Sequence, residues 1–313
     1  MGIFHHDHDH GSGHAHGSGG HAHDGTRAFA VVTLLNLAYT AVEAGFGFAT
    51  NSLALLSDAL HNLGDVLGLG LAWAAAAMAR RPPSGRHTYG WRRATLLSPL
   101  ANALLLVGFS GALGWEAIQR IGAPPEVPAL PVILVATLGI AVNLGAAWLV
   151  RSGHEHDLNR RGAFLHLVAD AAVSLAAVLA GLGMFAFGWA WLDPVTALLI
   201  GGVVAIGAFG LLRESFEAAM DAVPRSIEHR QVLEFLQSQP GVSAVHHLHI
   251  WSLGAGEIAM TAHLVRPHAA DHDRFLDGLA RELDARFGIN HPTIQVEHGG
   301  DCEHDRHDRA PHH

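Results

Sequence analysis

Two pairs of His and Asp, each four residues apart, lie within apolar stretches of the chain. "LHNLGD" at 60–65 contains His61 and Asp65, and "LHLVAD" at 165–170 contains His166 and Asp170. Residues four apart on a helix share a face, about 6 Å apart along the axis, so each pair can point at one ion. Two imidazole nitrogens and two carboxylate oxygens form a tetrahedral set that suits Zn²⁺ better than Mg²⁺ or Ca²⁺. The spacing therefore predicts a four-ligand zinc site.

Ionisable side chains within an apolar helix need a reason, because each costs about 3 kcal/mol at the centre of a bilayer. The alternative to a metal site is a structural network of buried His and Asp that fixes the helices. Two matched pairs on separate helices favour the metal site. Asp58 shares the face of Asp65 and is a candidate proton or entry group. Single polar residues in the other apolar stretches are interpreted as packing or pathway groups: Asn36, Tyr39, Glu43, Asn102, Glu116 and Asn143.

The elements that must position these pairs are membrane helices. The chain has 313 residues, half of them hydrophobic and only 15% charged, against about 25% charge in an ordinary soluble domain. Six apolar segments are each long enough to cross about 30 Å of hydrocarbon, which takes roughly 20 residues. They are 28–49, 52–79, 94–121, 128–150, 162–187 and 192–212. The sequence predicts an all-α bundle of six transmembrane helices in a lipid bilayer.

Arginine placement predicts the orientation of the bundle. The loops after the second and fourth segments are rich in arginine, whereas the turns after the first and fifth have none. By the positive-inside rule, both termini are then cytoplasmic, and Trp189 and Trp191 belong to an aromatic belt on the opposite side. The N-terminus opens with polar residues, so no secretory signal is expected. The arginines are Arg80, Arg81, Arg86, Arg92, Arg93, Arg151, Arg160 and Arg161.

Beyond residue 213 the pattern becomes that of a small soluble domain. Helical periodicity over 226–239 and 271–287 alternates with strand patterns over 242–253, 257–265 and 291–298. The order α-β-β-α-β predicts an α+β, ferredoxin-like fold. The predicted organisation is a His-rich tail (1–26), a six-helix membrane domain (27–213), a cytoplasmic metal-binding and dimerisation domain (214–298) and a polar tail (299–313).

The predicted strands carry a second group of candidate ligands. Alternation along each strand collects His249, His263, His291 and Glu297 on the polar faces, which predicts a second zinc site. The alternation points His246 the other way unless its strand starts later. The alternative is that histidines serve as polar surface residues on these strands.

The remaining histidines are weaker candidates. His87 follows the second apolar segment, while His154 and His156 precede the fifth and could pass zinc to His166. The N-terminal histidines could raise the local metal concentration, although part of either terminus could instead be a purification tag. The single cysteine, Cys302, excludes an internal disulfide and any multi-thiolate site. A net charge of -9 gives no reason to expect nucleic-acid binding.

Several motifs together resemble the cation diffusion facilitator family, and within it the zinc-transporting branch. They are the two His-x-x-x-Asp pairs, "LLSDALHN" (55–62), "TYGWRR" (88–93) and "VHHLHIWSL" (245–253), within a resemblance over residues 27–298. One position differs, because relatives often have Glu where this chain has Thr95. The resemblance implies homodimers that export zinc from the cytoplasm in exchange for protons. The lack of a targeting sequence and the short linkers separately suggest the plasma (inner) membrane.

The resemblance also implies roles for particular residues. His61, Asp65, His166 and Asp170 would form the transport site, with His61 associated with zinc preference. His246, His249, His263, His291 and Glu297 match positions that the family uses for cytoplasmic zinc, which would stabilise the dimer. Proton coupling has independent support, because zinc needs neutral imidazole and ionised carboxylate, so zinc and protons compete.

Other functions remain as alternatives at this point. A passive zinc channel could use the same ligands without protons, and a membrane-anchored zinc sensor or buffer would use mainly the soluble domain. An intramembrane metalloprotease would need a motif such as H-E-x-x-H, which is absent, so no enzyme is expected.

Overall fold

The computed structural model describes residues 19–151, 158–267 and 271–299. Six long helices come first, and six segments within them are long and apolar enough to cross a membrane. The helices confirm the predicted bundle, because each apolar run is long enough to cross the hydrocarbon of a bilayer as a helix. Their bounds are α1 Gly19–Thr50, α2 Leu53–Ala79, α3 Ala94–Ile121, α4 Ala129–Arg151, α5 Leu158–Phe187 and α6 Leu192–Ala219.

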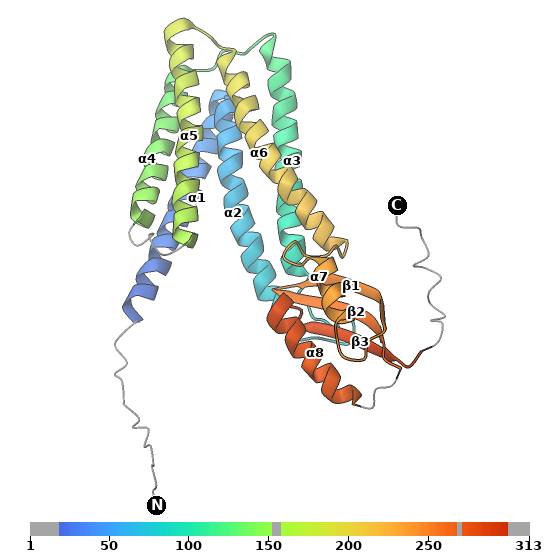
Figure 1. The fold of residues 1–313 in the computed structure, drawn as a ribbon. Coiled ribbons are helices and arrows are strands. Elements are labelled where there is room, and N and C mark those ends of the chain that lie inside the picture. The colour runs from blue at the N-terminus through green and yellow to red at the C-terminus, as the bar shows by residue number, and fades with distance from the viewer. Residues whose placement is uncertain (1–18, 152–157, 268–270, 300–313) are drawn as a thin grey trace, which may run out of the picture.

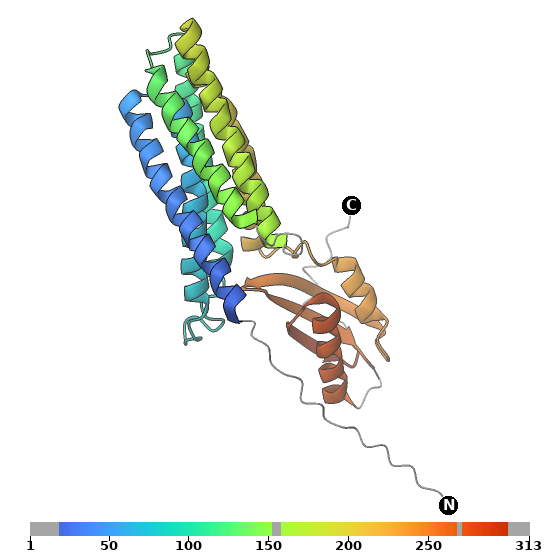
Figure 2. The same cartoon turned by 90° about the vertical axis from the view of Figure 1, so that its left-hand side faces the viewer.

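The helices form two groups joined by α2. In Figure 1, α1, α4 and α5 lie on one side of α2, and α3 and α6 on the other. Turning the molecule shows the helices running side by side, with the C-terminal domain beyond one end of the bundle (Figure 2). We call the opposite end, where α1 meets α2 and α5 meets α6, the far end. The two ligand-bearing helices, α2 and α5, therefore face each other between the two groups.

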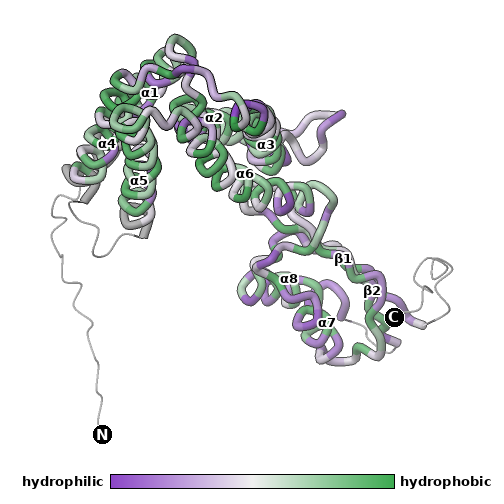
Figure 3. The backbone as a smooth tube through the Cα atoms, turned by 90° about the horizontal axis from the view of Figure 1, so that it is seen from above, coloured by the Kyte–Doolittle hydropathy of each residue, from purple (hydrophilic) through white to green (hydrophobic). Residues whose placement is uncertain are grey.

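The outer surface of the bundle is apolar. Phe48, Trp73, Ile206 and Phe209 are exposed there, each by more than 60% of its surface. The hydropathy colouring shows the same contrast between the mostly hydrophobic bundle and the more mixed C-terminal domain (Figure 3). An apolar exterior over six membrane-length helices is what a bilayer requires of the proteins that cross it.

A buried carboxylate fastens the far end. Asp193, at the start of α6, lies 2.6 Å from Ser52 Oγ and accepts hydrogen bonds from the backbone N–H of Leu53 (2.8 Å) and Ala54 (3.2 Å). These amides begin α2 and have no partner within the helix, so a carboxylate is the natural acceptor for them. Asp193 thereby fixes the turn between α1 and α2 against α6.

The C-terminal domain has the predicted α-β-β-α-β order. Its elements are α7 His229–Gln237, β1 Ala244–Gly254, β2 Glu257–Val265, α8 His272–Phe287 and β3 His291–Glu297. β1 pairs antiparallel with β2, and β2 pairs parallel with β3. The two helices bury apolar side chains against one face of this sheet, and the polar residues of the strands occupy the other face. The core residues include Val232, Leu236, Ile250, Met260, Leu264, Leu279 and Leu283.

Two predicted helix ends differ most from the structure. The sixth span was predicted to end at residue 212, but α6 continues to Ala219. Its last turns carry charged residues, of which Arg213 and Glu217 form an i, i+4 ion pair at 2.8 Å. The first helix begins at Gly19, before the predicted start at residue 28. Both differences arise because a membrane helix can continue into water once polar residues begin.

Candidate metal centre

The four intramembrane candidates meet between α2 and α5. His61 Nε2 lies 3.1 Å from Asp170 Oδ1, and His166 Nε2 lies 3.1 Å from Asp65 Oδ2 and 3.6 Å from Asp170 Oδ2. Ligand atoms of His61, Asp65 and Asp170 lie within 4.8 Å of one another, the spacing of groups that could hold a metal ion. The i, i+4 step on each helix brings both members of a pair to the same face, so the two faces together present two nitrogens and two carboxylates.

The four side chains differ sharply in exposure. Asp65 and His166 are 40% and 47% exposed, whereas His61 is 23% and Asp170 only 1% exposed. Asp65 is one turn closer than His61 to the end of α2, and His166 is one turn closer than Asp170 to the start of α5. Both exposed ligands therefore lie on the side of the C-terminal domain, and the buried carboxylate lies toward the far end.

A buried polar network continues from the site toward the far end. Tyr39 Oη donates to Glu43 Oε1 at 2.6 Å, and Asn62 Nδ2 donates to Glu43 Oε2 at 3.1 Å. Ser174 Oγ donates to Asp58 Oδ2 at 2.8 Å. All five side chains are at most 4% exposed. The network links α1, α2 and α5 directly behind the ligands.

Gly139 of α4 makes room for this network. A Cβ at Gly139 would collide with Tyr39 Oη and come within 3.0 Å of Ser174 Oγ. An apolar cluster that includes Leu55, Val135 and Met184 packs around Tyr39. The polar network is thus enclosed by apolar packing, while the ligands on the opposite side are open.

A second group of ligands lies on the polar face of the C-terminal sheet. His246 Nε2 lies 3.1 Å from Glu297 Oε2, and His263 Nδ1 lies 2.8 Å from Glu297 Oε1. One atom of each residue lies within 4.8 Å of the others. Two imidazoles and a carboxylate fit Zn²⁺, which accepts three protein ligands and a further group. His246 Nδ1 is buried and forms no hydrogen bond with any of the described residues.

The strand alternation predicted the wrong direction for His246. The β1–β2 register shifts between His246 and His249, and His247 has a positive φ of 51°. This is a β-bulge, in which an extra residue reverses the alternation beyond it. As a result His246 pairs across the strands with His263, and His249 pairs with Thr261. Both histidines consequently share the polar face.

His249 and His291 do not join this group. His249 is exposed and lies further along β1, with its ring 6.4 Å from that of His247. His291 Nε2 lies 3.0 Å from Glu257 Oε2 and 3.4 Å from Arg92 Nη1. It begins β3, whereas Glu297 ends it, so the length of the strand separates them. His249 and His291 were predicted as ligands because they lie on the polar face of the sheet. Their distance from Glu297 along the sheet, however, keeps them out of the group.

The loop before α3 binds the β1–β2 hairpin. Arg92 forms an ion pair with Glu257, and Thr95 Oγ1 accepts a hydrogen bond from the backbone N–H of Ala255 at 2.8 Å. Nearby, Arg93 Nη2 lies 2.8 Å from Asp221 Oδ1. Thr95 thus makes a backbone contact between the two domains.

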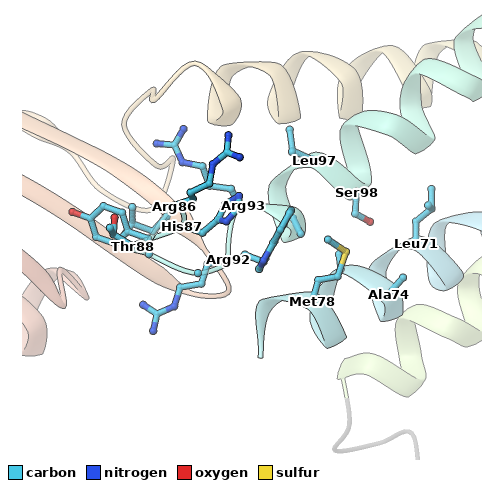
Figure 4. A pocket seen from close by; sticks show the side chains of 16 residues that line it. Leu71, Ala74, Met78, Arg86, His87, Thr88, Arg92, Arg93, Leu97 and Ser98 are labelled. Atoms are coloured by element: carbon cyan, nitrogen blue, oxygen red, sulfur yellow. The ribbon is translucent and has the colours of Figure 1, made fainter. Parts of the chain in front are cut away.

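A cavity of about 550 Å³ lies beside this contact. Its walls include Leu71 and Met78 from α2, Ser98 from α3 and the loop residues Arg86 and His87 (Figure 4). The His87 ring stacks on Trp91 with the ring centroids 4.3 Å apart. The structure gives His87 this packing role, and none of the other candidate ligands among the described residues lies beside it. His154 and His156 lie outside the described residues.

Sequence reasoning left Glu43 and Asp193 without a role. Glu43 was interpreted as a packing or pathway residue, although Tyr39 and Glu43 repeat the four-residue step of the ligand pairs. This four-residue spacing within an apolar helix could have indicated that the two side chains share a face and act together. Asp193 precedes a proline at the start of α6, and this sequence pattern is common at the first turn of a helix. The pattern therefore gives no indication that Asp193 contacts Ser52.

The fold and the site define a class of protein. Six membrane-length helices enclose a cluster of ionisable side chains, and such residues within a membrane domain mark ion or substrate pathways. The chain is a multi-pass membrane protein, with a small α+β domain at one end of the bundle.

Comparison with known proteins gives the family. Residues 29–218 match the cation efflux transmembrane domain, and residues 224–299 match the cation efflux protein cytoplasmic domain. The chain therefore belongs to the cation efflux, or cation diffusion facilitator, family of divalent cation transporters and is not an enzyme. These matches confirm the family that the sequence motifs indicated.

Named relatives cover most of the chain. The zinc transporter ZitB of Escherichia coli is 37% identical over 269 residues, covering 83% of this chain and 85% of that protein. The metal cation efflux system protein CzcD of Cupriavidus metallidurans is 35% identical, covering 88% and 89%. The cadmium, cobalt and zinc/H(+)-K(+) antiporter of Bacillus subtilis is 33% identical, covering 83% and 85%.

A solved structure resembles part of the chain. The metal-bound C-terminal domain of the CzcD transporter from C. metallidurans is 35% identical, with a TM-score of 0.22. It covers 23% of this chain and 99% of that structure.

Proposed function

We propose that this protein exports Zn²⁺ from the cytoplasm in exchange for protons, through a site formed by His61, Asp65, His166 and Asp170. Zinc as the cargo is supported by the ligand set, because two imidazoles with two carboxylates suit a borderline metal at tetrahedral geometry. The names of the relatives agree, since ZitB is a zinc transporter and CzcD a cation efflux protein.

The observation that carries the proposal is the one-sided exposure of the site. Asp65 and His166, the two ligands nearer the C-terminal domain, are 40% and 47% exposed, while Asp170 is buried and the network beyond it is enclosed. Alternating access needs a single site that is open to one side at a time and closed to the other. With the C-terminal domain in the cytoplasm, the described conformation is the one that loads cytoplasmic zinc.

Proton exchange follows from the chemistry of the ligands. Zinc binds neutral imidazole and ionised carboxylate, so binding releases any proton that these groups hold, and protonation displaces zinc. Histidine titrates near neutral pH, which puts this competition in the physiological range. The inward gradient of protons can therefore drive zinc outward if the site faces each side in turn.

The remaining parts of the proposal concern the assembly. We propose that both termini are in the cytoplasm, on the arginine distribution. We further propose that the membrane is the plasma (inner) membrane. We also propose that the chain is a homodimer and that His246, His263 and Glu297 hold zinc that stabilises the C-terminal domain. The donor set at these three residues fits zinc, and no path through the bundle is needed to reach it.

The test is zinc transport into proteoliposomes that contain a zinc dye and a pH indicator. We expect wild type to move zinc inward and protons outward in molecules whose cytoplasmic side faces the medium. Asp65→Ala should reduce both movements to the rate of protein-free liposomes, because it removes a ligand from the open side of the site. Glu116→Gln, a half-exposed carboxylate on α3 paired with Arg120, is the matched control and should transport normally.

Each other outcome identifies an alternative. Zinc movement without proton movement would indicate a passive channel. A folded protein that binds zinc without transporting it would indicate a sensor or buffer. Normal transport by Asp65→Ala would contradict the assignment of the site.

A further inference from the structure

Two buried carboxyl groups lie against each other behind the metal centre. Glu43 of α1 and Asp58 of α2 are both 0% exposed, and their carboxyl groups are close enough to share a hydrogen bond. No arginine or lysine of the described residues interacts with either carboxyl group. The charged and titratable groups that face them are Tyr39 beside Glu43, and His61 and Asp170 beside Asp58.

The hydrogen bonds of this pair are incomplete if both carboxyls are ionised. Glu43 accepts from Tyr39 and Asn62, and Asp58 Oδ2 accepts from Ser174. Asp58 Oδ1 is buried and accepts from no N–H or O–H group of the described residues. A proton on Glu43 would supply that missing donor, because a protonated carboxyl donates one O–H.

Electrostatics favours the same state. Two carboxylates in contact and out of water repel each other, so one of them retains a proton. Burial of an unpaired charge adds to this preference. Both Glu43 oxygens already accept a hydrogen bond, from Tyr39 and Asn62, whereas Asp58 Oδ1 accepts none from the described residues. A proton on Glu43 therefore completes the hydrogen bonds of the pair, so Glu43 is the member placed to hold it.

The position of the pair connects it to the site. Asp58 is one turn before His61 on α2, and its partner Ser174 is one turn beyond Asp170 on α5. Both steps lead from the ligands toward the far end, away from the open side. The pair therefore lies between the metal centre and the side to which zinc is delivered.

We infer that Glu43 holds an exchangeable proton, shared with Asp58, that is passed to the metal centre when zinc leaves toward the far end. This inference rests on the proposed proton exchange. In the transfer, the Glu43 O–H bond breaks, Asp58 takes the proton and then gives it to a ligand that zinc has vacated. Water on the far side returns a proton to Glu43, so one proton moves inward in each transfer.

Glu43→Gln tests the inference because it preserves the shape of the network. The amide can donate to Asp58 Oδ1 and to a reoriented Asn62, while its oxygen still accepts from Tyr39. A residue that only holds the helices together would be replaced well by glutamine. A residue that must release a proton would not, because the amide cannot.

We expect Glu43→Gln to bind zinc with wild-type affinity and to export it at least about tenfold more slowly, as for loss of a positioned proton donor. The dependence of the export rate on the pH of the far side should flatten. Asp58→Asn should give the same flattening and serves as the second variant if Glu43→Gln does not fold. Glu116→Gln should retain the wild-type profile. A wild-type rate and pH profile in both test variants would overturn the inference.

Infrared spectroscopy of the wild type provides a test that does not depend on transport. We expect the C=O band of a protonated carboxylic acid at neutral pH, and its loss in Glu43→Gln. Absence of this band in the wild type would overturn the inference even if zinc and protons are exchanged. Conversely, a band that is present in the wild type and lost in Glu43→Gln, in a protein that moves no protons, would contradict the proposed function and leave the proton on Glu43 established.

Discussion

A single residue, His247, decides which histidines of the C-terminal domain can share a metal ion. His247 has a positive φ of 51° and lies at the point where β1 has one residue more than β2. The alternation of side chains reverses at this bulge. Without the bulge, His246 would lie on the face that packs against the helices. With the bulge, His246 reaches Glu297, and His249 lies further along the strand.

This placement predicts different results for two neighbouring histidines. His246→Ala should lower the zinc bound per chain by one ion, because it removes one of three converging ligands. His249→Ala should leave the bound zinc unchanged. Equilibrium zinc binding to the two full-length variants in detergent measures the difference, and the His-rich tail contributes equally to both. Equal losses in the two variants would contradict the three-residue site.

At the scale of the elements, the start of α2 is held by other parts of the chain. Asp193 of α6 accepts hydrogen bonds from the first amides of α2, and Ser52 lies against the same carboxylate. Arg120 of α3 binds the carbonyl oxygen of Asn51 at 2.9 Å in the same turn. The helix that carries His61 and Asp65 is therefore anchored to α3 and α6 at the far end.

Loss of the Asp193 carboxylate should destabilise the bundle. Asp193→Ala leaves the Ser52 hydroxyl and the α2 amides without their buried acceptor, which should lower the free energy of unfolding by about 2–4 kcal/mol. Thermal unfolding in detergent measures this loss. Glu116→Gln breaks a half-exposed ion pair at the same end and should cost less than about 1 kcal/mol. If the two variants unfold at the same temperature, Asp193 does not anchor α2.

At the scale of the whole molecule, the two domains meet through the β1–β2 hairpin and the loop before α3. Gly254 allows this close approach, because it has a φ of +90° and an added Cβ would collide with the Arg92 carbonyl and lie 2.7 Å from Thr95 Oγ1. The ion pair of Arg92 with Glu257 and the Thr95–Ala255 hydrogen bond lie at the same place.

Two glycines of the hairpin allow a controlled test of this contact. Gly254 and Gly256 both have positive φ, so alanine strains the backbone at either, but only Gly254 has no space for a Cβ. Gly254→Ala should therefore separate the domains and raise hydrogen exchange at residues 92–95, whereas Gly256→Ala should not. Zinc export should fall in the first variant alone. Unchanged exchange in Gly254→Ala would show that the domains do not depend on this contact.

Periodicity and hydropathy were sufficient to predict the elements. The six apolar runs, the α-β-β-α-β order and the two i, i+4 ligand pairs are properties of neighbouring residues. Helix geometry converts the spacing of His61 and Asp65, or of His166 and Asp170, directly into a shared face. These features could be predicted because they depend on the chain only over a turn or two.

Contacts between distant segments were decided by the tertiary structure. The sequence by itself determined the membrane helices, the soluble domain and the ligand pairs, since burial of apolar surface and local geometry set them. Only the folded chain brought Glu43 against Asp58, Asp193 against Ser52 and His246 against Glu297, because each of these contacts depends on helix packing or strand register. Buried polar groups find their hydrogen-bond partners through such packing, and the local sequence does not predict which partner each group will have.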